Sequence, residues 1–396
     1  MEELGIVALA NKGTIGDETI AVDTLHRTPR ALRLAEEFER SIEQTRWFKD
    51  YLHSVDPIPS EVLEELAQSS CLCRLGEHPD EREAIRDALL IEPNPERLEP
   101  TQKRRGAFAL LLEQIKVQPE VAESDSAFRN QVTTAYERSS SHSGARATTQ
   151  DQWAAMVMRE CLQDSISTIW LAFCRAGLAT QPYEGCTPNE LRGLIKEQLF
   201  ADGTVLIGES TVTGSPNENA TTWLASLQSA SSGLEWEELR EMVAASESGL
   251  TGLATLLILA SRVPNENDAG REWELVARAD GESQPGLRNL VSILNRQLDS
   301  GQSVLGLLEW FVLRFIVAIH ETVAMGKLPN STFRFYWEHG RLRFVDNGVW
   351  RFDPSGLRRE ALAQVSRDLG WWDKDGQGTA QLTEDGRALI HEVFDS

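Results

Sequence analysis

The chain has 396 residues, an apolar fraction of 41% and a formal net charge of −22. This length exceeds one ordinary hydrophobic core, and the apolar fraction excludes an intrinsically disordered chain. The acidic balance disfavours loose attraction to nucleic acid or to an anionic membrane, and it is typical of a soluble protein.

Two features of the sequence predict a cytoplasmic location. The N-terminus begins with two acidic residues and lacks the basic segment of a signal peptide. The five cysteines are an odd number in a long chain, which favours reduced thiols over a disulfide framework. Cys71 and Cys73 end an apolar helical pattern, and no second pair lies at zinc-site spacing. We therefore interpret them as two small buried thiols.

Most of the first 300 residues predict helices. Residues 4–25 hold two short apolar runs, which fit a hairpin or an irregular helix entry. Apolar residues recur at helical spacing in several later segments. These segments are residues 29–42, 60–73, 79–90, 101–116, 153–176, 188–200, 220–230, 234–246, 249–262 and 286–298.

Local signals mark some of the boundaries. The small and polar stretch 138–150 predicts a linker. Gly177 is expected to cap the helix before it, and the sequence Thr187-Pro188-Asn189-Glu190 predicts a capping box. Residues 202–219 are rich in turn residues and predict two short strands.

The most apolar helix runs from Ser303 to Met325 and predicts a length of roughly 35 Å at 1.5 Å per residue. Its centre carries Glu309 and Arg314, which would be costly inside a bilayer. We therefore expect the axis of a protein core and no membrane span. Arg314, His320 and Glu321 are weak catalytic candidates, with an internal polar network as the alternative.

The character of the chain changes after residue 326. Residues 332–352 alternate and are aromatic, which predicts strands with turns at Glu338-His339-Gly340 and Asp346-Asn347-Gly348. Helical patterns return at 357–369 and 384–394. We therefore expect a mainly α fold, a multi-helix bundle closed by a small α+β tail, with domains at 1–140, 150–326 and 327–396.

Residues 361–390 resemble the end of a winged-helix domain. Leu369-Gly370-Trp371-Trp372 matches the close of its recognition helix. Leu382-Thr383-Glu384-Asp385-Gly386 matches the entry from the wing into the last helix. The chain departs from the family where two short helices should precede the recognition helix, because an aromatic strand segment stands there. The resemblance therefore implies a contact module for either DNA or protein.

Only one stretch of the chain, residues 331–367, is markedly positive. Residues 331–367 carry seven arginines and four acidic residues. Clustered arginines can contact phosphates, although alternating arginines also form the solvated face of a sheet. The nucleic-acid-binding candidates are Arg341, Arg343, Arg351, Arg358, Arg359 and Arg367.

Other site motifs are incomplete. Asp373, Asp375 and Glu384 fall at ligand positions of an EF-hand loop, but its other positions fit poorly, so they are weak calcium candidates beside a wing hairpin. The sequence has no Walker A, G-x-G-x-x-G or G-x-S-x-G motif, and no cofactor is predicted.

These features favour a non-enzymatic subunit or adaptor of a prokaryotic multiprotein assembly acting on nucleic acid, with genome defence as one setting. Its expected partners are other protein subunits, together with DNA or RNA contacted through the tail. One alternative is a hydrolase of nucleic acid or nucleotide with a polar site on the helix at 303–325. The other is a transcriptional regulator whose helical body senses a ligand.

Overall fold

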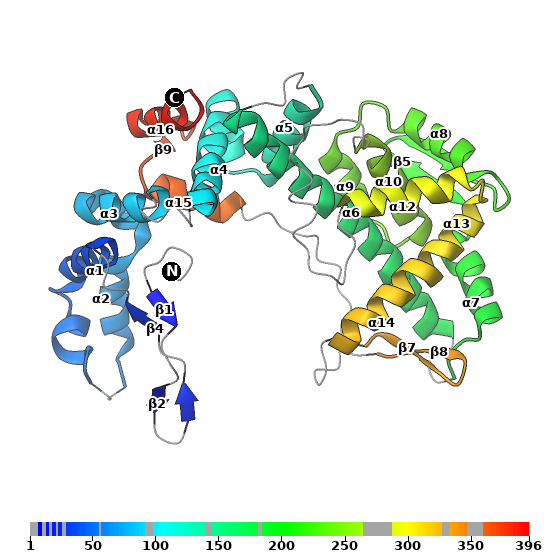
Figure 1. Ribbon diagram of the computed structural model, residues 1–396, viewed down its shortest axis with the longest axis horizontal. Helices are drawn as coiled ribbons and strands as arrows, with labels where there is room; N and C mark the ends of the chain where they lie inside the picture. The colour runs from blue at the N-terminus through cyan, green and yellow to red at the C-terminus, as the bar shows by residue number, and fades with distance from the viewer. Residues whose placement is uncertain are drawn as a thin grey trace. The chain divides into compact units, whose positions relative to one another are not determined.

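The predicted mainly α class is confirmed. In this computed structural model the described residues are 29–54, 57–91, 98–138, 144–180, 184–263, 287–326, 333–346 and 359–395, with four short strands between residues 7 and 25. Over this part of the chain the protein is mostly helical, with five two-stranded antiparallel sheets (Figure 1). None of the described helices is long and apolar enough to cross a membrane.

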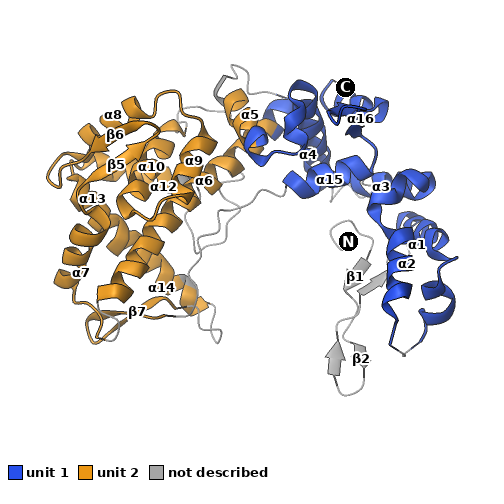
Figure 2. Ribbon diagram, turned by 180° about the vertical axis from the view of Figure 1, so that it is seen from behind, with its two compact units in different colours: residues 1–128, 143–149, 358–396 blue, residues 129–142, 150–357 orange. Residues whose placement is uncertain are grey.

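The chain divides into two compact units that each combine distant segments (Figure 2). Unit 1 holds residues 1–128, 143–149 and 358–396, and unit 2 holds residues 129–142 and 150–357. Within residues 327–396, the aromatic hairpin lies in unit 2 and the last helices lie in unit 1.

Unit 1 is built around helix α4 (Leu98–Val117), which buries Phe108 to Leu112 and Ile115. Helix α16 packs against α4, and the Phe108 ring meets Trp371 edge-on with 4.9 Å between centroids. The other elements near the N-terminus are β1 (Val7–Leu9), β2 (Gly13–Ile15), β3 (Glu18–Ile20), β4 (Asp23–Leu25), α1 (Pro29–Ile42), η1 (Trp47–Tyr51), α2 (Ser60–Ser70), η2 (Leu72–Glu77), α3 (Pro79–Leu90) and η4 (Pro119–Ala122). The C-terminal elements are α15 (Arg359–Asp368), β9 (Trp372–Lys374), β10 (Ala380–Leu382) and α16 (Glu384–Phe394).

Unit 2 surrounds helix α10 (Gly249–Arg262), in which residues 249–260 are all buried. Ser248 caps α10 by accepting a hydrogen bond from the Thr251 amide at 3.3 Å. The other helices and strands are α5 (Asp125–Arg138), α6 (Ala145–Thr180), α7 (Pro188–Leu194), η5 (Ile195–Phe200), β5 (Thr204–Ile207), β6 (Ser210–Thr213), α8 (Ala220–Ala230), α9 (Trp236–Ala244), α12 (Leu287–Asp299), α13 (Val304–Trp310), η6 (Phe311–Ile316), α14 (Val317–Gly326), β7 (Phe335–Glu338) and β8 (Arg341–Phe344). Helices α5 and α6 are divided between the units, with residues 125–128 and 145–149 in unit 1 and their remaining residues in unit 2.

Two local predictions around α6 are wrong. The linker or exposed loop expected at 138–150 is wrong over residues 145–150, which lie in the long helix α6, while residues 139–143 are outside the described residues. Gly177 does not end that helix, which continues to Thr180. A Cβ at Gly177 would lie 2.2 Å from the Phe344 ring, so this glycine allows close contact between α6 and β8.

The capping box and the first aromatic hairpin are confirmed. Thr187 and Glu190 cap α7 reciprocally, with Pro188 in the first turn. Strands β7 and β8 pair antiparallel through a turn in which His339 and Gly340 have positive φ. The second turn, at 346–348, lies partly outside the described residues.

The apolar helix at 303–325 is present, but it is not regular throughout. Ser303 caps α13 by accepting a hydrogen bond from the Gly306 amide at 3.1 Å. The chain then passes through the π-helical turn η6 into α14. A π-helical turn adds a residue to the helical repeat, so the two halves present different faces.

Candidate functional sites

The tail of unit 1 forms a helix, a hairpin and a second helix. Gly370 has a φ of +74° and ends α15, after which the chain buries Trp371 and Trp372. The Trp372 indole N–H donates to the Ala363 carbonyl at 3.1 Å and to the Ser366 hydroxyl at 2.9 Å. The two tryptophans therefore fix the hairpin to α15.

The Leu-Thr-x-x-Gly motif has a physical role in this arrangement. The Thr383 hydroxyl accepts from the Gly386 amide at 3.1 Å and donates to the Gly370 carbonyl at 2.8 Å. A Cβ at Gly386 would lie 2.0 Å from the Trp371 carbonyl oxygen, so only glycine allows this approach. The motif thus joins the start of α16 to the end of α15.

Two candidate arginines in the tail serve local structure. The Arg359 side chain is only 5% exposed and pairs with Asp125, and its Nη1 donates to the Ala122 carbonyl at 2.7 Å. Arg367 is half exposed, pairs with Asp373 at 2.9 Å and lies over the Trp372 ring at 5.6 Å. The Arg359 guanidinium therefore contacts protein atoms inside unit 1, and Arg367 offers part of its charge to solvent.

The other two described candidates lie in unit 2, on β8. Arg341 donates to the Glu184 and Gly185 carbonyls at 3.1 and 3.0 Å and pairs with Glu190 at 3.1 Å. Arg343 pairs with Glu338 on β7. Arg351 and Arg358 lie outside the described residues. The candidates are thus divided between the two units.

The surface of α15 and the hairpin has an excess of acidic groups. Lys374 pairs with Glu123, and Arg367 pairs with Asp373. The charged residues that are exposed or half-buried on α15 and the hairpin include two basic and four acidic side chains. They are Glu360, Arg367, Asp368, Asp373, Lys374 and Asp375. Phosphate binding requires the opposite balance.

The EF-hand candidates are engaged in the hairpin itself. Asp375 accepts hydrogen bonds from the Thr379 and Gln377 amides, which lower its pKa. The pKa of Asp373 is lowered by the Lys374 amide and by Arg367. Glu384 lies in the first turn of α16. Over the described chain no group of three or more His, Cys, Asp or Glu residues could hold a metal ion.

The three candidates on the apolar helix lie in different surroundings. His320 Nε2 accepts from the Arg334 amide at 3.0 Å, and its ring centroid lies 4.4 Å from that of Phe335. Arg314 is exposed on η6, and Glu321 is half-buried on α14. His320 therefore has a structural contact that joins α14 to the start of β7.

A buried ion network in unit 2 was not found from the sequence. Arg240 on α9 pairs with Asp164 on α6 at 2.6 Å and with Glu237 at 3.0 Å. Arg129 on α5 pairs with Glu160 at 2.9 Å and lies 3.5 Å from Glu237. The sequence gives only a weak signal for this network, which is the presence of charged residues three or four positions apart within otherwise apolar helices.

Burial changes the acidity of this network. The pKa of Glu160 is raised by burial, against the opposing charge of Arg129. The pKa of Arg240 is raised by its bonds to Asp164 and Glu237, although burial opposes this rise. Three carboxylates face two guanidinium groups, so the network carries an excess of one negative charge if all its groups are ionised. We interpret this as a structural element of the core.

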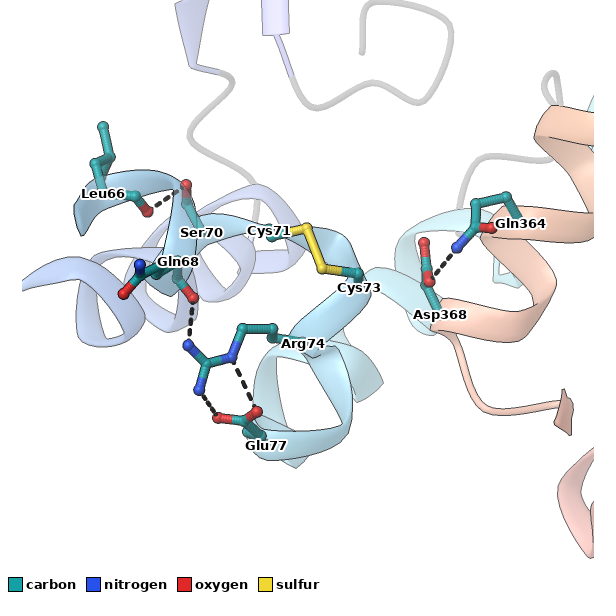
Figure 3. Close-up of a disulfide and its surroundings, with 9 residues drawn as sticks. All are labelled: Leu66, Gln68, Ser70, Cys71, Cys73, Arg74, Glu77, Gln364 and Asp368. Atoms are coloured by element: carbon teal, nitrogen blue, oxygen red, sulfur yellow. Dashed lines mark hydrogen bonds and ion pairs between the residues drawn. A yellow bond between two sulfur atoms is a disulfide. The ribbon is translucent and has the colours of Figure 1, made fainter. Parts of the chain in front are cut away.

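The cysteine interpretation is wrong for the first pair. Cys71 and Cys73 are exposed and joined by a disulfide, with 5.2 Å between their Cα atoms (Figure 3). The helix expected to carry both cysteines stops before them, because α2 ends at Ser70 and Cys71 is extended with a ψ of 126°. The other three cysteines are free and buried.

Most of the large apolar side chains that are exposed over the described residues belong to unit 1. Of the twelve found over the described residues, nine belong to unit 1 and three to unit 2. Six of the nine come from the segment between α1 and η2. These six are Leu32, Phe38, Leu52, Ile58, Leu63 and Leu72, which are between 37% and 49% exposed.

Comparison of the chain with protein-family models, with curated proteins and with solved structures finds no match.

Proposed function

We propose that the protein is a non-enzymatic subunit or adaptor that binds another protein through unit 1. The observation that supports this function is the surface of residues 29–90, where six large apolar side chains are exposed. Where such side chains form a contiguous patch, the patch marks a protein–protein interaction site.

The charge of the same segment indicates the chemistry of the partner. Residues 29–90 carry eight basic and fourteen acidic side chains, a net charge of −6. Several of these charges are held in pairs with other surface groups, such as Arg46 with Glu65 and Arg33 with Asp87. The remaining excess is negative, so the partner surface should combine apolar side chains with lysine or arginine.

Variants of exposed leucines test the proposed surface. The double variant Leu63→Ser/Leu72→Ser should weaken partner binding at least about tenfold, because buried apolar anchors dominate interfaces. The melting temperature should change little, since both side chains are already exposed. The measurement is calorimetric titration of the purified variant with a partner isolated from the native host.

Leu206→Ser in unit 2 is the matched control, because Leu206 is 59% exposed. Its binding should equal that of the unmodified protein. Unchanged binding by the double variant, or equal losses in the double variant and the control, would contradict the proposed surface.

A second candidate function is nucleic-acid contact through a winged-helix-like tail. The observation that favours it is the bonding of Thr383 and Gly386 within the helix–hairpin–helix unit, where the sequence resembles that family. Arg367→Ala should then weaken DNA binding and reduce its dependence on salt concentration. A gel-shift titration at several salt concentrations measures this, and absence of binding by the unmodified protein would exclude this candidate.

A further inference from the structure

Cys71 and Cys73, which form the disulfide, are both exposed residues. Cys71 follows the last residue of α2, and its amide donates to the Ala67 carbonyl at 3.0 Å. Cys73 lies in the first turn of η2, and both cysteines are exposed (Figure 3). The exposure of both residues lets a thiol in solution approach the disulfide.

The other cysteines do not compete for thiol chemistry. Cys161, Cys174 and Cys186 are each at most 1% exposed. Burial raises the pKa of Cys161 to about 12 and also raises the pKa of Cys174 and Cys186. Because the thiolate is the reactive form, chemistry with solution thiols is confined to the pair at 71 and 73.

The disulfide lies beside contacts that position the tail helix. Helix η2 packs against α15 and α3, and its Leu75 is buried. Arg74 in η2 pairs with Glu77 and donates to the Gln68 carbonyl of α2 at 2.8 Å. On the facing helix α15, Gln364 donates to Asp368 at 2.7 Å (Figure 3). The disulfide thus restrains the connection between α2 and η2, and η2 packs against α15.

We propose that Cys71 and Cys73 form a reversible thiol–disulfide exchange site whose oxidation state controls the packing of η2 against α15. The co-reactant is a thiol, either a low-molecular-weight thiol or a protein dithiol. In the disulfide state the bond restrains the turn from α2 into η2. In the dithiol state this restraint is absent, and η2 separates more readily from α15.

The exchange is balanced in atoms and electrons. A thiolate of the reductant attacks one sulfur and forms a mixed disulfide, and the second cysteine leaves as a thiolate that takes a proton from water. A second thiolate of the reductant then attacks the sulfur that the reductant contributed to the mixed disulfide. The first cysteine is released as a thiolate, which also takes a proton. The protein gains two electrons and two protons, and the reductant becomes a disulfide.

Thiol counting tests whether the site exists. The full-length protein is equilibrated in buffers of oxidised and reduced glutathione, labelled with iodoacetamide without denaturant, and mapped by peptide mass. The expected result is no label in the oxidising buffer and label at both Cys71 and Cys73 in the reducing buffer. Label at these residues in every buffer, or in none, would overturn the proposal. A parallel reaction with a thioredoxin-type protein distinguishes the two classes of reductant, because the effective one changes the labelling faster.

Hydrogen–deuterium exchange tests the structural consequence. Amides of η2 and α15 should exchange severalfold faster in the reduced protein, and unit 2 should be unchanged as an internal control. The double variant Cys71→Ser/Cys73→Ser should match the reduced protein in both buffers. Equal exchange of η2 and α15 in oxidised and reduced protein would overturn the coupling. Leu63→Ser, on α2 and outside the disulfide, should weaken partner binding to the same extent in oxidised and reduced protein, which separates this proposal from the proposed function.

Discussion

Unit 1 and unit 2 differ in which side chains they bury and which they expose. Unit 2 buries residues 249–260 of α10 and places even charged groups, such as Arg129 and Asp164, inside its core. Unit 1 leaves nine large apolar side chains exposed over its described residues and holds its ion pairs mostly at the surface. Unit 2 thus places charged groups inside its core, while unit 1 carries most of the large apolar side chains that are exposed over the described residues.

The largest expected effect concerns the buried network of unit 2. Arg240→Met should lower the free energy of unfolding by about 3–5 kcal/mol, because Asp164 and Glu237 would remain buried without their partner. Chemical denaturation followed by tryptophan fluorescence measures this loss. Arg175→Met is the matched control, since Arg175 forms a surface pair with Glu247 at 2.5 Å. That control should lose no more than about 1 kcal/mol.

Arg359 tests the same idea in unit 1. Arg359→Met should cost about 1–3 kcal/mol, because it removes a buried guanidinium from Asp125 and from the Ala122 carbonyl. The loss should appear in the unfolding transition of unit 1. Arg367→Met, at an exposed pair, should change stability by less than about 1 kcal/mol. A larger effect at Arg367 than at Arg359 would contradict the assignment of Arg359 to structure.

Gly177 tests how tightly unit 2 is packed. Gly177→Ala should cost about 1–3 kcal/mol, because the added methyl group meets the Phe344 ring. Thermal unfolding measures the loss. Gly193→Ala on α7 is a suitable control, since nothing lies within 4 Å of a Cβ there. Equal effects at the two positions would show that the hairpin β7–β8 yields to the added methyl group.

Glu160 gives the smallest expected effect, through pH. Its folded pKa is raised by burial above the unfolded value near 4.5, so the native state binds more protons than the unfolded state between these two values. Its contribution to stability is therefore greatest at low pH and falls as pH rises through that window. Denaturation between pH 4 and 8, roughly the relevant range, should show a smaller fall in stability with pH for Glu160→Gln than for the unmodified protein. An identical pH slope in both proteins would contradict the raised pKa.

The helices could be predicted from the sequence because their signals are local. Apolar spacing and caps predicted α3, α10 and α16 at their observed residues, and the capping box at Thr187 was also confirmed. The aromatic hairpin was predicted from alternation and from His339-Gly340. These signals depend on neighbours a few residues apart, so a single sequence contains them.

The long-range contacts could not be predicted in this way. Arg359 pairs with a carboxylate 234 positions away, and Arg240 pairs with one 76 positions away. Nothing in the local pattern distinguishes such arginines from those that face solvent. From the local sequence alone, Gly177 matches a helix-capping glycine. The contact that requires a glycine there is with Phe344, which belongs to a hairpin far away in the sequence. The Cys71–Cys73 pairing was missed because an apolar helical pattern suggested burial.

Site-specific photocrosslinking tests whether unit 1 is the part of the protein that binds a partner. p-Benzoylphenylalanine is placed at Phe38 in unit 1 or at Trp337 in unit 2, which are 41% and 38% exposed, and the native host is irradiated. We expect a discrete protein adduct from position 38 that is lost in the Leu63→Ser/Leu72→Ser background, and none from position 337. Adducts from position 337 alone, equal adducts from both positions, or no protein adduct from position 38 would contradict unit 1 as the partner-binding part.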